Sequence, residues 1–314
     1  HRILAYFGVD LYEAIMATHL RGEKTFFMPF NQGSNGAGKV GGKGNPEAPE
    51  GKYTTNYLWK RVLNRRMLLC ILQRYISRQE EERISIYKAK DGSIRQEKKK
   101  SVKIIFPRYH QLDVVEKLLA DTAEHGSGKN YLIQHSAGSG KSNSIAWVAY
   151  RLGALQNAEL KPMFNCVFVI TDRRVLNSQL QKTILGFDHV DGTVETVKDS
   201  DPSTKLRNLI NDDNSRIIIC TLHRFPLIYN EVKEHEGKRY AIIVDEAHSS
   251  QTGKSAEKMK AALADTEEAL REMAALQDIA EEELEKKRDA IMDTLLAQGQ
   301  HQNLSFYAFT ATPK

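Results

Sequence analysis

Two runs of polar residues have the types and spacing to act on phosphate groups. The first run reads His135-Ser-Ala-Gly-Ser-Gly-Lys141-Ser142. Its small residues let consecutive backbone N–H groups converge on phosphate oxygens, while Lys141 can reach terminal phosphates and Ser142 offers a hydroxyl to Mg²⁺. We therefore predict a phosphate-binding loop whose nucleotide contacts come from Ser136, Ala137, Gly138, Ser139, Gly140, Lys141, Ser142 and Asn143.

His135 departs from the strict pattern G-x-x-x-x-G-K-[ST], which has glycine at that position. Because the first glycine mainly serves the turn, the phosphate loop remains the best interpretation. Gly33–Val40 also spells G-x-x-x-x-G-K, but Val40 has no hydroxyl and its surroundings offer no helix. Gly253-Lys254-Ser255 does not directly follow a strand, so we interpret both segments as ordinary loops.

The second run, Asp245-Glu246-Ala247-His248, directly follows the apolar segment Tyr240–Val244. A carboxylate at the end of a buried strand is costly unless it binds a cation or accepts hydrogen bonds. Beside a phosphate loop, we expect Asp245 to hold Mg²⁺ and Glu246 to activate the attacking water. The alternatives are a helix cap for Asp245, and for His248 a capped loop position in place of a coupling role.

Other predicted strands also end in polar side chains. In open α/β sheets, ligands gather at the carboxyl ends of the strands. One such end taken alone is a weak signal, but their joint occurrence favours a single site at one edge of the sheet. The residues are Thr171, Asp172, Arg173 and Arg174 after Cys166–Ile170, Thr221 after Arg216–Cys220, and Thr310 and Thr312 after Ser305–Phe309.

An adenine-binding residue is predicted upstream, where Phe106-Pro-Arg-Tyr-His-Gln111 precedes a helix by one short step. The Gln111 amide can donate and accept hydrogen bonds at once, which matches the edge of adenine, and Arg108 or Tyr109 could stack on the ring. The alternative is that these residues only start the helix.

The elements that position these residues follow Ile104, where apolar strands alternate with polar or helical connections. Such alternation predicts an α/β fold in which helices wrap a parallel sheet, with further strands at Tyr131–Ile133 and Tyr240–Val244 and a helix over Ile145–Leu155. Residues from about 254 to 298 are highly charged with apolar positions at helical intervals, which predicts a protruding helical insert that serves as scaffold or partner contact.

The first hundred residues predict a different organisation. Apolar runs at Ile3–Val9 and Thr25–Phe30 indicate the edge of an α/β or α+β domain, and a glycine-rich loop follows to residue 52. Thr55–Arg78 predicts an amphipathic helix pair with a basic face, which is either solvated or faces DNA. Between Arg83 and Lys103, strand-like runs around Asp91-Gly92 predict a β-hairpin. We divide the chain at 1–55, 56–103 and 104–314.

Composition limits the class of protein. The 314 residues carry 45 Lys and Arg against 40 Asp and Glu, a net charge of +5 that permits a DNA partner without requiring one. The three cysteines lie far apart, which suggests neither a disulfide framework nor a zinc site and indicates a reducing, cytoplasmic compartment. No apolar run is long enough to span a membrane and no signal-peptide pattern begins the chain. Because the chain starts with His1 in mid-pattern, we expect a piece of a longer protein.

The order of these motifs resembles that of superfamily 2 helicases and translocases, with a DEAH box at residues 245–248. More narrowly, five stretches look like the R subunit of type I restriction-modification enzymes. These stretches are FPRYHQLDVV, NYLIQHSAGSGKSNSIAW, VITDRRVLNSQL, RYAIIVDEAHSSQ and FYAFTATPK. The resemblance is dense over residues 104–314, and the earlier segments YFGVD and FFMPFNQG are similar to the region that follows the nuclease motif of those subunits.

The resemblance implies a RecA-like domain of an ATP- and Mg²⁺-dependent motor. With modification and specificity subunits, such a motor pumps double-stranded DNA and cleaves it far from the recognition site. The implied roles are adenine binding by Gln111, phosphate and Mg²⁺ binding by Lys141, Ser142 and Asp245, water activation by Glu246, coupling by Thr310 and Thr312, and DNA-backbone contact by Thr171, Arg173, Arg174 and Thr221.

Two departures limit what the resemblance implies. No strand-borne Glu-x-Lys of the nuclease is present, so residues 1–55 would be the trailing part of an α/β nuclease-type domain. Residues 1–314 do not include a second RecA-like domain, so we expect these residues alone to bind ATP weakly and neither to hydrolyse it efficiently nor to translocate. Alternatives are another superfamily 2 ATPase, such as a DEAH-type RNA helicase, and a nucleotide-gated scaffold.

Overall fold

The computed structural model describes residues 3–88, 94–136, 138–171, 178–187, 193–198, 200–212, 216–221, 237–245 and 303–311. The chain divides into two units, His1–Val114 and Val115–Lys314, and each unit is described by itself. The division falls inside one helix, α2 (Tyr109–His125).

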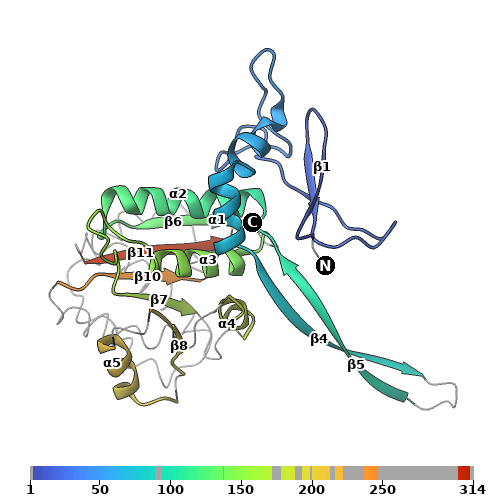
Figure 1. Ribbon diagram of the computed structural model, residues 1–314. Coiled ribbons are helices and arrows are strands. Elements are labelled where there is room, and N and C mark those ends of the chain that lie inside the picture. The colour runs from blue at the N-terminus through green and yellow to red at the C-terminus, as the bar shows by residue number, and fades with distance from the viewer. Residues whose placement is uncertain are drawn as a thin grey trace, which may run out of the picture. The chain divides into compact units, whose positions relative to one another are not determined.

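The second unit is built on a parallel sheet of six strands in the order β6-β11-β10-β7-β9-β8. Figure 1 shows these strands running side by side, with helices against the sheet. The strands are β6 (Tyr131–His135), β7 (Cys166–Thr171), β8 (Val194–Thr196), β9 (Ile217–Thr221), β10 (Tyr240–Val244) and β11 (Leu304–Ala311). The arrangement confirms the predicted α/β class with a parallel sheet.

Burial explains why these strands form at the centre of the unit. Every residue of β7, β9 and β10 is buried, as expected for parallel strands that are covered on both faces. The helix α3 (Lys141–Gly153) lies against β7, β9 and β10 and buries Trp147 and Leu152. The shorter helices α4 (Ser178–Leu185) and α5 (Ser203–Asn211) complete the described part of this unit.

The observed bounds differ from the predicted ones in a few places. The five predicted strands are confirmed, and most of them run one or two residues further than predicted. The helix predicted from Ile145 begins earlier, at Lys141, because Gly140 caps it. The edge strand β8 was not predicted. The predicted helical insert at about 254–298 lies outside the described residues.

The strands described in the first unit form two antiparallel sheets. The strands β1 (Tyr6–Val9), β2 (Ala14–Ala17) and β3 (Met28–Pro29) form one sheet. The strands β4 (Ser77–Lys88) and β5 (Ile94–Ile105) form a long hairpin, which confirms the predicted one and extends it at both ends. An α/β nuclease-type domain is not evident in this unit, so its assignment stays a prediction.

The helix pair predicted over Thr55–Arg78 is corrected by the structure. A 3-10 turn at Thr54–Asn56 and a π-helical turn at Leu58–Val62 come first. The helix α1 (Arg65–Arg74) then begins where the Asn64 side chain accepts a hydrogen bond from the Met67 backbone N–H. The segment ends in β4 because Ser77 pairs with Ile105 of β5, a partner that helical periodicity does not reveal.

Candidate nucleotide-binding site

The phosphate loop lies between the end of β6 and the start of α3. Its two turns are made by glycines with positive φ, 72° at Gly138 and 84° at Gly140, a conformation that side chains disfavour. His135 needs no such conformation, since Leu160 is the only non-glycine residue with positive φ in the described part of the chain. The histidine therefore replaces the glycine of the strict pattern without backbone strain.

Side chains within the loop hold its shape. The His135 Nδ1 atom lies 2.9 Å from the Ser139 hydroxyl, and both residues are buried. The Ser139 backbone N–H also donates to the Ser136 carbonyl at 3.1 Å. The loop then enters α3, whose N-terminus adds a partial positive charge where phosphates are expected.

An ion pair joins the loop to the strand that carries the acidic run. The Lys141 Nζ atom lies 3.1 Å from an Asp245 carboxylate oxygen, and the two side chains are only 16% and 5% exposed. Asp245 comes directly after β10, and its backbone N–H donates to the Ile170 carbonyl of β7 at 3.0 Å. The structure therefore brings together the ammonium and the carboxylate that the sequence predicted to share one nucleotide.

Comparison with known proteins agrees with this geometry. A sequence model of the SWI2/SNF2 ATPase family matches residues 110–268, half of the 314-residue chain. The chain belongs to the SWI2/SNF2 ATPase family. The matched residues of this SWI2/SNF2 ATPase include the phosphate loop and the run that begins at Asp245.

Two individual proteins are also similar to this SWI2/SNF2 ATPase. The type I restriction enzyme HindI endonuclease subunit of Haemophilus influenzae is 32% identical over 153 residues, which cover 46% of this chain and 14% of that protein. The yeast DEAD-box splicing factor Prp28 aligns with 59% of this chain and 38% of its own, at 16% identity and a TM-score of 0.31. That structural likeness is too low to carry an argument.

Several predicted site residues of the ATPase stay predictions. Ser142 and Asn143 are half-buried in the first turn of α3, and Thr310 is half-buried near the end of β11. Thr171 and Thr221 pair in register at the ends of β7 and β9, and each is 1% exposed, so a DNA contact would require both threonines to become accessible. Seven predicted residues lie outside the described ones, namely Ala137, Asp172, Arg173, Arg174, Glu246, His248 and Thr312.

The predicted adenine-binding residues belong to the first unit. The Arg108 backbone N–H donates to the Gln111 side-chain carbonyl at 2.9 Å, a contact of the capping-box type at the start of α2. Gln111 thus has the helix-start role that the sequence offered as the alternative, and adenine binding by Gln111 and Arg108 stays a prediction. Tyr109 is buried and forms edge contacts with Phe30 and Tyr57, so it belongs to an aromatic core.

Two charged clusters were not predicted from the sequence. In the first unit, Arg61 pairs with Asp113 at 2.7 Å and donates to the Tyr109 hydroxyl at 2.7 Å. In the second unit, Lys129 pairs with Asp121 at 2.6 Å. Both pairs depend on tertiary placement, so spacing in the sequence gives no signal for them.

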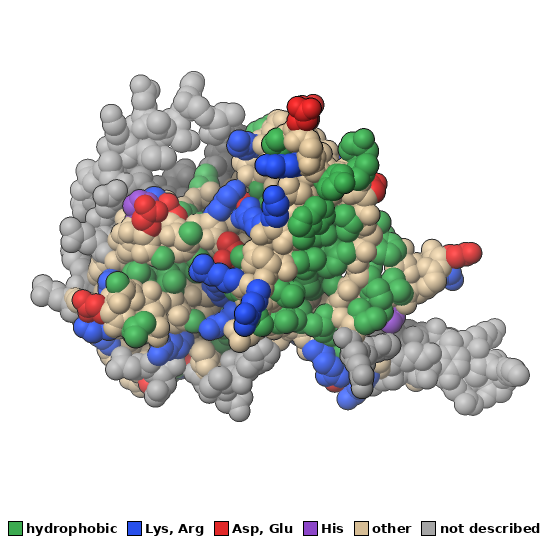
Figure 2. Space-filling view, turned by 45° about the horizontal axis from the view of Figure 1, so that its top comes forward, with side chains coloured by type: hydrophobic (Ala, Val, Ile, Leu, Met, Phe, Trp, Pro, Cys, Tyr) green, Lys and Arg blue, Asp and Glu red, His purple; other side chains and the backbone are tan. Residues whose placement is uncertain are grey.

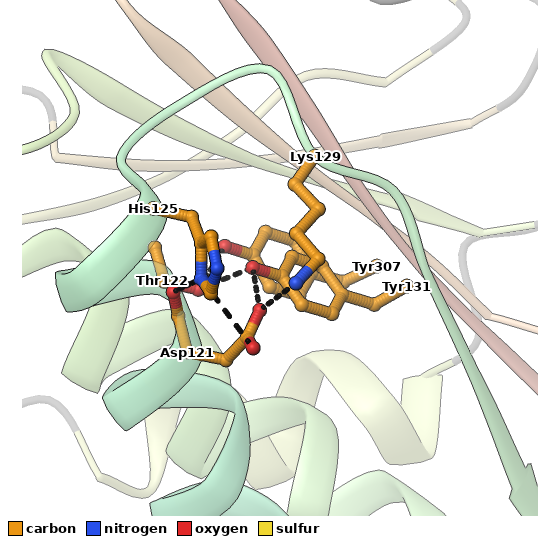
Figure 3. Close-up of polar contacts among 6 residues, drawn as sticks. All are labelled: Asp121, Thr122, His125, Lys129, Tyr131 and Tyr307. Atoms are coloured by element: carbon orange, nitrogen blue, oxygen red, sulfur yellow. Dashed lines mark hydrogen bonds and ion pairs between the residues drawn. The ribbon is translucent and has the colours of Figure 1, made fainter.

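The second of these clusters ties α2 to two strands, as Figure 3 shows. The Tyr131 hydroxyl of β6 donates to Asp121 at 2.9 Å, and the Tyr131 ring stacks on Tyr307 of β11 at 4.8 Å. The Tyr307 hydroxyl lies 2.8 Å from that of Thr122. Burial raises the pKa of Tyr131 to about 12, which keeps this hydroxyl protonated. The cluster lies at the start of β6, whereas the phosphate loop follows the end of that strand, so we interpret it as structural.

Proposed function

We propose that this chain is the nucleotide-binding part of the double-stranded DNA translocase motor in a type I restriction endonuclease R subunit. The observation that carries the ATP-binding role is the 3.1 Å pair between Lys141 and Asp245 across the ends of neighbouring elements. The restriction-enzyme assignment is supported by the HindI endonuclease subunit, which this chain matches over 14% of that protein's length.

The residues of the loop fit a Mg²⁺–triphosphate. Backbone N–H groups around Gly138 and Gly140 and the Lys141 ammonium would bind phosphate oxygens. Ser142 and Asp245 supply the hydroxyl and carboxylate oxygens that Mg²⁺ prefers, and Asp245 is a buried carboxylate fixed beside Lys141. When bound, the metal would neutralise charge on the phosphates.

Hydrolysis and coupling are assigned to residues that follow the strands. Glu246, next to Asp245, would orient and deprotonate the attacking water. His248, Thr310 and Thr312 would couple the state of the nucleotide to the grip on DNA. The residues that would contact the DNA backbone are Thr171, Arg173, Arg174 and Thr221. Such contacts are independent of base sequence and weaken with salt.

Partner subunits and DNA have candidate surfaces in the first unit. The exposed basic residues of α1 and the preceding turn are Lys60, Arg65, Arg66 and Arg74, and they fit contact with a DNA backbone as well as simple solvation. Figure 2 shows apolar side chains gathered in a patch on the face that it draws. The exposed apolar residues of the first unit include Tyr12, Phe26 and Tyr53. Exposed apolar patches are typical of protein interfaces, so we assign this one to the modification and specificity subunits.

The ATP-binding role is tested by Lys141→Ala in the full-length protein. Loss of the ammonium removes a charge-assisted contact to the terminal phosphates, so Mg²⁺-ATP binding measured by calorimetry should fall below detection. Lys129→Ala is the matched control, because Lys129 also pairs with an aspartate but lies at the other end of β6. Equal binding by Lys141→Ala and the wild type would remove the assignment.

The motor role is tested by ATP turnover with and without linear duplex DNA. We expect duplex to stimulate turnover and single-stranded RNA not to do so. Stimulation by RNA alone would favour the second candidate, another superfamily 2 ATPase of helicase type, which the family match over residues 110–268 leaves open. No stimulation by either nucleic acid would favour a nucleotide-gated scaffold.

A further inference from the structure

In the described part of the phosphate loop, a side-chain contact joins His135 to Ser139. His135 ends β6, is 6% exposed, and lies with its Nδ1 atom 2.9 Å from the hydroxyl of Ser139, which is 7% exposed. The imidazole ring also lies against Phe309 of β11, with ring centroids 5.8 Å apart. The histidine therefore connects the middle of the loop to the neighbouring strand.

A free hydroxyl at Ser139 would interfere with the loop. Serine hydroxyls bind nearby backbone N–H groups in turns, and the N–H groups of this loop are the ones that phosphate oxygens need. The contact with His135 fixes one orientation of the Ser139 side chain and so disfavours its rotation toward those groups. The same contact restrains the loop before a phosphate arrives, which lowers the entropy lost on binding.

The position of His135 allows it to act in this way. Its backbone pairs with Ala311 of β11, and its φ is not positive, so the residue is fixed as part of the sheet. The ring contact with Phe309 limits the rotation of the imidazole. A glycine at this position would have neither the ring nor the Nδ1 atom.

We propose that His135 is a positioning residue that holds the Ser139 hydroxyl away from the backbone N–H groups of the phosphate loop and so keeps the loop ready for a triphosphate. This inference rests on the proposed ATP-binding function. It concerns a residue that contacts the loop rather than the nucleotide.

The decisive comparison uses three variants of the full-length protein with Mg²⁺-ATP as the probe. His135→Phe keeps an aromatic ring against Phe309 but removes the hydrogen bond, so we expect affinity to fall about 3- to 10-fold, as for loss of one buried hydrogen bond. Adding Ser139→Ala to His135→Phe removes the interfering hydroxyl and should recover most of the lost affinity. Gln134→Ala, an exposed neighbour on β6, is the control and should bind like the wild type.

A second pair of variants separates the hydrogen bond from packing. Asparagine places a polar atom where His135 has Nδ1, whereas glutamine places one where it has Nε2. We therefore expect His135→Asn to bind Mg²⁺-ATP within about twofold of the wild type and His135→Gln to show the weaker affinity of His135→Phe. Because the restraint acts equally before and during reaction, KM should rise with little change in kcat.

The outcomes distinguish this inference from the proposed function. If wild-type protein and Lys141→Ala bind Mg²⁺-ATP equally, the ATP-binding function fails and the role of His135 fails with it. If Lys141→Ala loses binding but His135→Phe and His135→Gln bind like the wild type, only the role of His135 is overturned. Failure of Ser139→Ala to recover affinity in the double variant also overturns it. Melting temperatures measured without nucleotide identify a variant that has not folded. If His135→Phe does not fold, the affinities of His135→Asn and His135→Gln decide whether the hydrogen bond to Ser139 matters.

Discussion

Asp245→Asn should change how strongly Mg²⁺ increases the affinity of the protein for ATP. The substitution keeps the size of the side chain and removes its charge. Asp245 holds Lys141 at 3.1 Å, so the carboxylate both attracts a metal ion and competes with phosphate for the ammonium. Without the charge, metal-free ATP should bind more tightly, while the gain in affinity from Mg²⁺ should be lost.

The geometry sets the size of the effect. At an effective dielectric constant of about 20, unit charges 3.1 Å apart attract by about 5 kcal/mol. Desolvation of the two buried groups offsets much of this attraction, which leaves a net contribution of about 1–3 kcal/mol. We therefore expect a change of about 5- to 150-fold in each affinity, upward for metal-free ATP and downward for Mg²⁺-ATP.

Calorimetric titration with ATP in EDTA and in excess Mg²⁺ measures both affinities in the full-length protein. Asp121→Asn is the matched control, because Asp121 also pairs with a lysine, Lys129 at 2.6 Å, but is far more exposed. Its removal should leave both affinities unchanged. Exposed pairs contribute little to stability, so the melting temperature should fall further for Asp245→Asn than for Asp121→Asn.

One result would refute the reasoning directly. If Asp245→Asn keeps the wild-type ratio of affinities for Mg²⁺-ATP and metal-free ATP, then Asp245 neither binds the metal nor competes for Lys141. The buried pair would then be structural, the assignment of Asp245 would be withdrawn, and the ATP-binding role would depend on the phosphate loop and Lys141 alone.

Three further predictions test other parts of the site and fold. Glu246→Gln should retain ATP binding while turnover falls by about 10²-fold or more, the usual loss for a general base, and retained turnover in a steady-state assay would make Glu246 structural. Gly138→Ala and Gly126→Ala both place a side chain at positive φ in open space, so each should lower the free energy of unfolding by about 1–2 kcal/mol, but only Gly138→Ala should weaken ATP binding. The hydrogen bond from Lys129 lowers the pKa of Asp121. The contribution of the Asp121 carboxylate to folding stability is therefore complete above the ordinary carboxyl pKa of about 4 and is lost as the pH falls through the lowered pKa. In Asp121→Asn, the free energy of unfolding measured in urea should depend less on pH over that acidic range.

The central sheet was predictable because each of its main strands is a continuous apolar run that ends in polar residues. Tyr240–Val244 is the clearest case, since prediction and structure agree at both ends. The edge strand β8 has three residues, too few to show a period. The helical segments predicted over Thr55–Arg78 are present at Leu58–Val62 and Arg65–Arg74, but the predicted end is wrong. The strand that replaces this end depends on pairing with a segment nearly thirty residues away.

The candidate site was predictable to the extent that strand ends determine it. The proximity of Lys141 and Asp245 could be predicted because the carboxyl ends of parallel strands meet at one edge of the sheet. It did not show that Tyr109 is buried, since the aromatic residues around it come from segments far away in the chain. Nor did it show that Gln111 completes a helix start, although the spacing from Arg108 is that of a capping box.

The mismatch at His135 shows where a sequence pattern and the physical requirement behind it differ. The strict pattern has glycine at the first position of the loop, yet the positive φ angles of this loop fall at Gly138 and Gly140. Only those two positions need glycine on conformational grounds, so the first is free to carry a side chain. Here that side chain contacts Ser139, so the residue that departs from the pattern restrains the loop. The φ that each position requires is therefore a better guide to the phosphate loop than the letters of its pattern.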